Sequence, residues 1–264
     1  MSVFEAILMG IIQGLTEFLP VSSSGHLEIA SVIFGIQGEE NLAFTTVVHG
    51  GTVLSTIVVF WKYLGRLLSG FFKFKPSPEM LFCVNLLISA LPILFVAMMF
   101  KDQIETLFTG NLLLVGCMLL VTALLLTFSQ KAKPRNRPIT MKDAFIIGIA
   151  QAVAVLPGLS RSGSTISTGL LLGVKREEVA SFSFLMALIP IIGANLLELF
   201  GGGFGQAASA VGTIPLVAGF LSSFVVGALA CKLMINLVKR GNLIWFAVYC
   251  AVVGLIAIGY SLFA

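Results

Sequence analysis

The sequence has few charged residues. Only 11% of its 264 residues are Asp, Glu, Lys or Arg, whereas 58% are hydrophobic and the mean hydropathy is +1.05. Because about a quarter of the residues of a typical soluble protein are charged, a soluble enzyme of this size is excluded. Intrinsic disorder is excluded as well, since disordered chains are poor in apolar residues. We therefore expect an all-α, polytopic membrane protein.

Paired metal-ligand and disulfide patterns are also lacking. The four cysteines stand singly in apolar runs, and we interpret them as small buried hydrophobic residues. No Lys or Arg precedes Lys62, so the N-terminal stretch is not expected to be a signal peptide.

Six apolar segments are long enough to cross about 30 Å of hydrocarbon as helices. They lie near residues 42–61, 81–99, 111–129, 179–199, 214–237 and 243–262. Two further apolar stretches, 3–36 and 142–174, are interrupted by Pro, Gly and clustered Ser. Neither half of either stretch reaches about 20 residues, so each is predicted to be a re-entrant hairpin of two short helices.

The cations indicate how the chain is oriented. Fourteen of the 16 Lys and Arg residues fall in or beside four connections, near residues 62–80, 130–142, 175–176 and 232–240. Basic loops stay in the cytoplasm. We therefore predict a multi-pass protein of the bacterial cytoplasmic (inner) membrane that contacts membrane lipids, with 37–41, 100–110 and 200–213 outside. The basic residues serve as orientation signals, and nucleic acid is not an expected partner.

An internal repeat relates the two hairpins. Residues 6–44 align with 144–182 at a constant offset of 138, and eleven of the 39 positions are identical. The identical pairs include polar residues, so the match is more than a similarity of two apolar segments.

Each copy of the repeat contains one hairpin and three spans. Three crossings are an odd number, so the second copy is predicted to be inverted relative to the first. We expect a single integral membrane domain over 1–264, with repeat one at about 1–130 and repeat two at about 140–264. The broken hairpin tips then meet near the midplane, where irregular backbone is tolerated only inside protein or beside a wet cavity.

The first tip, QGLTEFLPVSSSGH, carries acid–base groups. Gln13 and Glu17 share one helix face just before Pro20 ends the regular helix. Glu17 and His26 can supply general acid–base chemistry or activate a nucleophile. The oxygens of Gln13 and Glu17 also suit a divalent cation such as Mg²⁺ or Ca²⁺.

The second tip, PGLSRSGST, suits a phosphate group. Arg161 stands among hydroxyls and glycines at the start of a half-helix, where its guanidinium and the helix dipole both favour an anion. The position that matches Glu17 is Val155. Four other polar residues in or near the spans do not belong to such a polar cluster, and we interpret them as interhelical hydrogen-bonding or interface residues. They are His49, Asn85, Asn195 and Glu198.

Together, the two motifs resemble those of bacterial undecaprenyl-diphosphate phosphatases, the family linked to bacitracin resistance. The resemblance covers essentially the whole chain. It implies a membrane hydrolase that converts undecaprenyl diphosphate to undecaprenyl phosphate and inorganic phosphate, recycling the lipid carrier for peptidoglycan synthesis, with a site facing the periplasm. Family members generally need Mg²⁺ or Ca²⁺, and Gln13 stands where some of them carry a second Glu.

The resemblance implies that Glu17, His26, Ser23 and Arg161 are catalytic. The substrate-binding residues that it implies are Gln13, Ser22, Ser24, Gly25, Ser160, Ser162, Gly163, Ser164 and Thr165. Whether water attacks directly or Ser23 becomes phosphorylated is left open, as is a homodimer. The alternative is a polyprenyl-phosphate flippase or secondary transporter, because broken helices in inverted repeats are typical of transporters.

Overall fold

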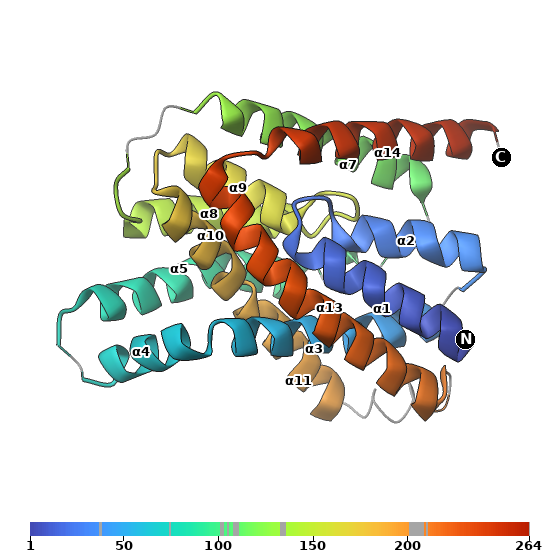
Figure 1. Ribbon diagram of the computed structural model, residues 1–264, viewed down its shortest axis with the longest axis horizontal. Helices are drawn as coiled ribbons and strands as arrows, with labels where there is room; N and C mark the ends of the chain where they lie inside the picture. Colours follow the sequence, from blue (N-terminus) through green and yellow to red (C-terminus); the bar gives the residue numbers. More distant parts are fainter. Residues whose placement is uncertain are drawn as a thin grey trace.

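The computed structural model describes residues 1–36, 39–73, 75–100, 103–104, 106–107, 111–132, 136–200, 209 and 211–263, apart from the side chains of 39–43 and 198–199. This part of the chain is all-helical and contains no β-strand (Figure 1). The helices are α1 (Val3–Phe18), α2 (Ser23–Phe34), α3 (Glu39–Val59), α4 (Trp61–Phe71), α5 (Pro78–Met99), α7 (Leu112–Gln130), α8 (Met141–Val153), α9 (Arg161–Leu171), α10 (Arg176–Met186), α11 (Leu188–Phe200), α13 (Thr213–Arg240) and α14 (Ile244–Phe263).

Long apolar helices make the chain a multi-pass membrane protein. By length and composition, α5, α7, α13, α14 and the combined segment Arg176–Leu197 can each cross a membrane. The bent pair α3–α4 supplies a sixth candidate span. The six expected segments therefore correspond to helices.

The first expected span, 42–61, differs from a straight helix. The chain bends by 76° between α3 and α4, and α4 occupies residues that were expected to be a loop. Its apolar residues recur at helical spacing. Leu67 is buried against the rest of the protein, whereas Trp61 and Leu68 are exposed. The expectation of a loop over 62–80 was wrong because a short amphipathic helix and a basic loop both carry Lys and Arg.

The fourth span has a break in its helix. Helix α10 ends at Met186 and α11 begins at Leu188. Pro190 has no backbone N–H to donate to the preceding turn, which favours a break at this point.

The basic connections gather at one end of the molecule. In Figure 1 the α4–α5 connection and the start of α8 lie toward one end, and both termini lie toward the other. This arrangement agrees with the alternation of spans expected from the charge pattern. Lys101, Lys133 and Arg135, which contribute to that charge pattern, lie outside the described residues.

Both stretches predicted as re-entrant hairpins form two short helices around a break, α1–α2 and α8–α9. Each hairpin also has a glycine at the same repeat position that permits close packing. A Cβ on Gly10 would lie 2.4 Å from the Gly219 carbonyl oxygen of α13, and one on Gly148 would lie 2.5 Å from the Ser89 carbonyl oxygen of α5. Helix α1 thus packs on α13 as its counterpart α8 packs on α5. The inversion of the two repeats stays a prediction.

Two of the other polar residues of the spans, Asn85 and Asn195, make structural contacts. The Asn85 amide donates to the Ile139 carbonyl at 3.1 Å, linking α5 to the segment before α8. Asn195 donates to Ile191 within α11 and lies against Gly50 of α3. These two residues confirm the expected interface role, whereas the side chain of Glu198 lies outside the described residues.

An ion pair fixes the entrance of the second hairpin. The Arg137 guanidinium donates to both Asp143 carboxylate oxygens and to the Leu172 carbonyl at the end of α9. Asp143 also closes a capping box with Thr140 at the start of α8. The hydrogen bonds from Arg137 lower the pKa of the Asp143 carboxyl from 3.8 to about 2.

Asp143→Asn is expected to destabilise the protein by about 1–3 kcal/mol, because charge-assisted hydrogen bonds are lost in a buried position. The lowered pKa means that this stabilisation is present above pH 3.8 and disappears as the pH falls toward about 2. Thermal unfolding in detergent micelles at several pH values measures both effects.

Glu5→Gln is the matched control. Glu5 and Ser2 form the same capping box at the equivalent, exposed position of α1. Its replacement is expected to lower the unfolding temperature much less. Equal effects of the two substitutions would show that the Arg137 ion pair contributes nothing beyond capping.

Candidate active site

The two hairpin tips meet through equivalent capping turns. Ser22 caps α2 by accepting from the Gly25 N–H at 3.2 Å, and Ser160 caps α9 by accepting from the Gly163 N–H at 3.0 Å. Ser22 adopts a φ of 71°, which is rare for a residue with a side chain. A Cβ on Gly25 would lie 3.0 Å from the Cα of Gly158, so the tips are in close contact.

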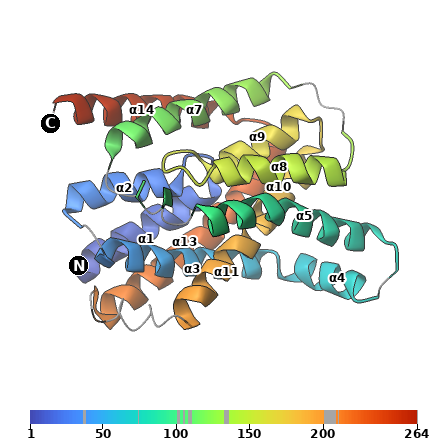
Figure 2. The ribbon, with the colours of Figure 1, turned by 180° about the vertical axis from the view of Figure 1, so that it is seen from behind.

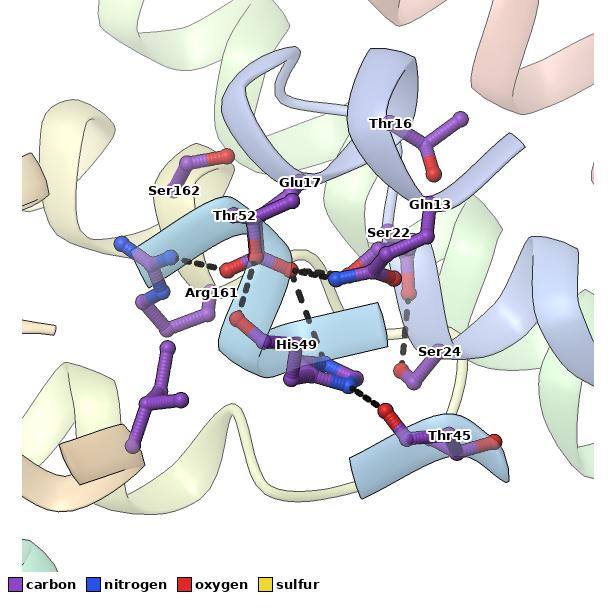
Figure 3. Close-up of polar contacts among 12 residues, drawn as sticks. Gln13, Thr16, Glu17, Ser22, Ser24, Thr45, His49, Thr52, Arg161 and Ser162 are labelled. Carbon is purple, nitrogen blue, oxygen red and sulfur yellow. Dashed lines mark hydrogen bonds and ion pairs between the residues drawn. The ribbon is translucent and has the colours of Figure 1, made fainter. Parts of the chain in front are cut away.

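Glu17 is the centre of the site. It lies in the last turn of α1 and is only 8% exposed. Its Oε2 accepts from Ser23 Oγ at 2.7 Å and from Gln13 Nε2 at 3.0 Å. Its Oε1 accepts from the Arg161 guanidinium of the other hairpin. The sequence-predicted residues Gln13, Glu17, Ser23 and Arg161 are therefore brought together. Figure 3 shows Gln13, Glu17 and Arg161 in this arrangement.

Arg161 is held from two sides. One terminal nitrogen donates to Glu17 and the other donates to the Ser183 carbonyl of α10 at 3.0 Å. The Ser183 hydroxyl is in turn within 2.7 Å of Thr165 Oγ1. An arginine has five N–H donors, so further donors remain for an anionic ligand.

A polar cavity of about 250 Å³ lies beside this cluster. Hydroxyl, carboxylate, imidazole and guanidinium groups line it together with apolar side chains of the second tip and of α11. The lining residues are Thr16, Glu17, Ser22, Ser23, Ser24, His49, Ala154, Val155, Leu159, Ser160, Arg161, Ser162 and Ile191.

Two helix N-termini border the cavity. Ser23 and Arg161 are the first residues of α2 and α9, and both line it. The first N–H groups of a helix lack acceptors within that helix, and the helix dipole places partial positive charge at this end. Two such ends together with a guanidinium make the cavity suitable for an anion that carries several negative charges.

His49 belongs to the site, although the sequence analysis assigned it a structural role. The carbonyl of Thr45 can only accept, so His49 Nδ1, 2.8 Å away, is the protonated nitrogen. His49 Nε2 then faces the Glu17 carboxylate, 3.7 Å from Oε2. Figure 3 shows Gln13, His49 and Arg161 directed toward Glu17. The signal available in the sequence was the cost of an ionisable side chain at membrane depth.

His26 lies elsewhere. Its Nδ1 is 2.8 Å from the Ser22 carbonyl oxygen, and its Nε2 is 2.8 Å from the Tyr249 hydroxyl of α14. The imidazole stacks on the Tyr249 ring and does not line the cavity. The structure therefore does not bring His26 to Glu17, but it connects His26 directly to the residue that caps α2.

The remaining predicted residues fall into two groups. Ser24 bonds to Ser22 at 3.3 Å, Ser162 donates to the Leu19 carbonyl at 3.1 Å, and both line the cavity together with Ser160. By contrast, Gly163, Ser164 and Thr165, which follow in the first turns of α9, are buried and do not line the cavity.

Hard-cation ligands are present but sparse. Among the described residues, no three His, Cys, Asp or Glu side chains are placed to hold a metal ion. Gln13 is fully buried, and its Oε1 has no hydrogen-bond partner in the described part of the chain. This amide oxygen and the Glu17 carboxylate are donors of the kind that Mg²⁺ and Ca²⁺ bind, so the donor types suit a cation, although Nε2 rather than Oε1 of Gln13 faces Glu17 and Gln13 does not line the cavity.

Comparisons with known proteins all point to one family. A family model described as "Bacitracin resistance protein BacA" matches residues 6–256. A protein of Bacteroides fragilis strain YCH46 named undecaprenyl-diphosphatase is 58% identical over 260 residues, which cover 98% of both chains. Proteins of the same name from Parabacteroides distasonis and Methanosphaera stadtmanae are 56% and 38% identical, over 99% and 98% of both chains respectively.

Proposed function

Because the chain belongs to the bacitracin resistance protein BacA family, we infer that it is an undecaprenyl-diphosphate phosphatase. It hydrolyses undecaprenyl diphosphate to undecaprenyl phosphate and inorganic phosphate. The product is the lipid carrier for peptidoglycan precursors, and its regeneration confers resistance to bacitracin. The flippase or secondary transporter alternative is not favoured, because the relatives carry the name of a phosphatase.

One observation supports this chemistry above the others. A hydroxyl, a carboxylate and a guanidinium, from Ser23, Glu17 and Arg161, are in hydrogen-bond contact beside an anion-binding cavity. Transport requires recognition of the head group only. Phosphoryl transfer requires a nucleophile with a base beside it and a cation that stabilises the transferred group.

We assign the attack to Ser23. Its Oγ–H already points at Glu17 Oε2, so the proton can pass to the carboxylate as Oγ bonds to the terminal phosphorus. The bond from this phosphorus to the bridging oxygen breaks, and its electron pair leaves with undecaprenyl phosphate. Water, deprotonated by the same carboxylate, then releases inorganic phosphate and restores the Ser23 hydroxyl. Direct attack by water at the Ser23 position is the alternative that a test must separate.

Arg161 stabilises the charge on the transferred phosphoryl group. Its position at the first turn of α9 adds the dipole of that helix to the charge of the guanidinium. Its bond to the Ser183 carbonyl keeps the side chain extended toward the cavity even when a phosphate competes with Glu17. The hydroxyls of Ser22, Ser24, Ser160 and Ser162 supply further donors.

His49 exchanges protons with Glu17. It faces the carboxylate oxygen that also accepts from Ser23. A proton taken from Ser23 can therefore move on to His49, which frees Glu17 for the second step. His26 positions the Ser22 carbonyl and hence the cap of α2, so it acts indirectly.

Glu17 and Gln13 would hold a divalent cation against the diphosphate. Such a cation supplies electrostatic stabilisation of the phosphate oxygens when bound. Gln13 offers the unpartnered Oε1 described above, and the single carboxylate leaves most of the coordination to phosphate and water.

We place the protein in the bacterial cytoplasmic membrane with its basic connections inside. We propose that the site opens toward the outside, the end at which both termini lie; the absence of residues of the basic connections from the described cavity wall is compatible with this. The homodimer that the sequence left open stays a prediction.

Replacing Ser23 by Ala is expected to lower kcat for undecaprenyl diphosphate more than about 100-fold, because the nucleophile is lost. Phosphate release by the purified protein in detergent measures this, and a phosphoserine trapped by acid quench identifies the intermediate. Ser24→Ala is the matched control, since Ser24 lines the same cavity but bonds Ser22 rather than Glu17. Full activity of the Ser23→Ala protein would exclude Ser23 as nucleophile and favour direct attack by water.

His49→Ala is expected to lower kcat about 100-fold and to remove one limb of its pH profile, because a proton-transfer group is lost. His26→Ala and Tyr249→Phe are expected to lower activity without changing the shape of the profile. If His26→Ala removed the limb and His49→Ala retained it, the two histidines would have the opposite roles.

Removal of divalent cations by a chelator is expected to abolish phosphate release, and added Mg²⁺ or Ca²⁺ is expected to restore it. Gln13→Ala should raise the cation concentration needed for half-maximal activity, since one ligand oxygen is lost. Unchanged hydrolysis in excess chelator would show that Arg161 and the helix N-termini are sufficient to stabilise the phosphate charge without a metal ion.

A further inference from the structure

A wide apolar groove runs along the hairpin next to the polar cavity. It lies between α5 and α8, has a volume of about 640 Å³ and is lined almost entirely by apolar side chains. Phe95 of α5 and Val153 at the end of α8 line it and are more than half exposed, so the groove opens onto the lipid-facing surface. Figure 2 shows α5 and α8 side by side, with the hairpin tip beyond the end of α8.

The groove and the cavity meet at one residue. Val155 lines both of them. It occupies the repeat position that carries Glu17 in the first hairpin. The second hairpin therefore has an apolar side chain where the first has its carboxylate, at the point where a polar space joins an apolar one.

A prenyl diphosphate needs such a junction. Its hydrocarbon chain starts at the phosphate that is not hydrolysed, so the chain must leave the head-group cavity through an apolar part of the wall. Another route past the wall, at Ile191, leads to a space of about 10 Å³ between α3 and α10–α11. The route past Val155 leads to a space more than fiftyfold larger.

We propose that the α5–α8 groove binds the first isoprene units of the substrate, and that Val155 is the residue past which the chain leaves the cavity. This inference rests on the proposed phosphatase activity and extends it to the determinant of lipid recognition. The distal part of the chain continues from the open groove into the bilayer. Leu91, Phe145 and Ile149 complete the wall that the isoprene units contact.

The groove lies beside the tip of the second hairpin. Helices α5 and α8 both begin at the end that carries the basic connections, and the groove is lined by Leu91–Val96 in the second half of α5 and by α8 from Phe145 to its end. The end of the groove at Val155 is therefore level with the hairpin tips and with the polar cavity.

A second groove provides a control. Leu124 of α7 and Val248 of α14 line an apolar depression of about 380 Å³ that shares no lining residue with the polar cavity. Leu124 is 57% exposed, close to the 53% of Val153. Any effect of a bulky substitution on general lipid contacts should therefore be the same in both grooves.

The kinetic test compares Val155→Trp and Val153→Trp with Leu124→Trp. Hydrolysis is measured with undecaprenyl, farnesyl and isopentenyl diphosphate. Val153→Trp, which blocks the groove without entering the polar cavity, is expected to raise KM for undecaprenyl diphosphate at least about tenfold, with little change for isopentenyl diphosphate, whose short chain does not fill the groove. Val155→Trp also narrows the cavity and is expected to raise KM for all three substrates. Leu124→Trp is expected to leave all three KM values within about twofold of wild type.

The outcomes distinguish a failure of the proposed phosphatase function from a failure of the proposed lipid-binding groove. If the wild-type protein released no phosphate from any of the three substrates, the proposed function would fail. If it did, but the groove variants kept wild-type KM values, or all three variants raised KM equally, the groove would be an ordinary lipid contact and the proposal would be wrong.

A measurement that does not depend on activity completes the test. A prenyl diphosphate with a photoreactive group near its first isoprene unit should label α5 and α8, and mapping by mass spectrometry identifies the sites. Competition by undecaprenyl diphosphate is expected to remove this labelling. Labelling at α7 and α14, or labelling that no competitor removes, would overturn the assignment, including when Val155→Trp fails to fold.

Discussion

The ion pair between Glu17 and Arg161 is the constraint on which the rest of the structure depends. A carboxylate that is 8% exposed in an apolar surrounding is costly unless a cation and hydrogen-bond donors compensate it. Its cation lies 144 residues further along the chain, at the tip of the other hairpin. The hairpins must therefore meet tip to tip, and the close contact of Gly25 with Gly158 permits this approach.

Local signals made much of this architecture predictable. Pro20 and the serine cluster interrupt the first hairpin within a few residues, and the same break recurs at an offset of 138. Span length is set by the thickness of the hydrocarbon, so the long apolar helices could be placed from hydropathy alone. The presence of Glu17, Ser23 and Arg161 in one site also followed, because few polar residues are available at membrane depth.

Features that depend on distant contacts were not predictable. The bend after Val59 arises where the apolar face of α4 packs on α5, and basic residues in α4 look the same as those of a loop. The places of the two histidines were not predictable for a related reason. We expected His26 in the site and His49 outside it, and the structure has His49 beside Glu17 and His26 away from it. His26 is next to the serines in sequence, but its ring turns to Tyr249, while His49 reaches Glu17 from α3. Sequence proximity does not determine side-chain direction.

The two tips have equivalent helix caps but different side chains at matched positions, so the site is asymmetrical. Ser23 and Arg161 occupy equivalent positions as the first residues of α2 and α9, and both donate to the same carboxylate. The equivalent caps and helix dipoles suit the two similar phosphates of a diphosphate. Hydrolysis needs one nucleophile, one base and one exit for the hydrocarbon chain. In the proposed mechanism, the differences at matched positions, Ser23 against Arg161 and Glu17 against Val155, distinguish the phosphate that is attacked from the one that carries the lipid.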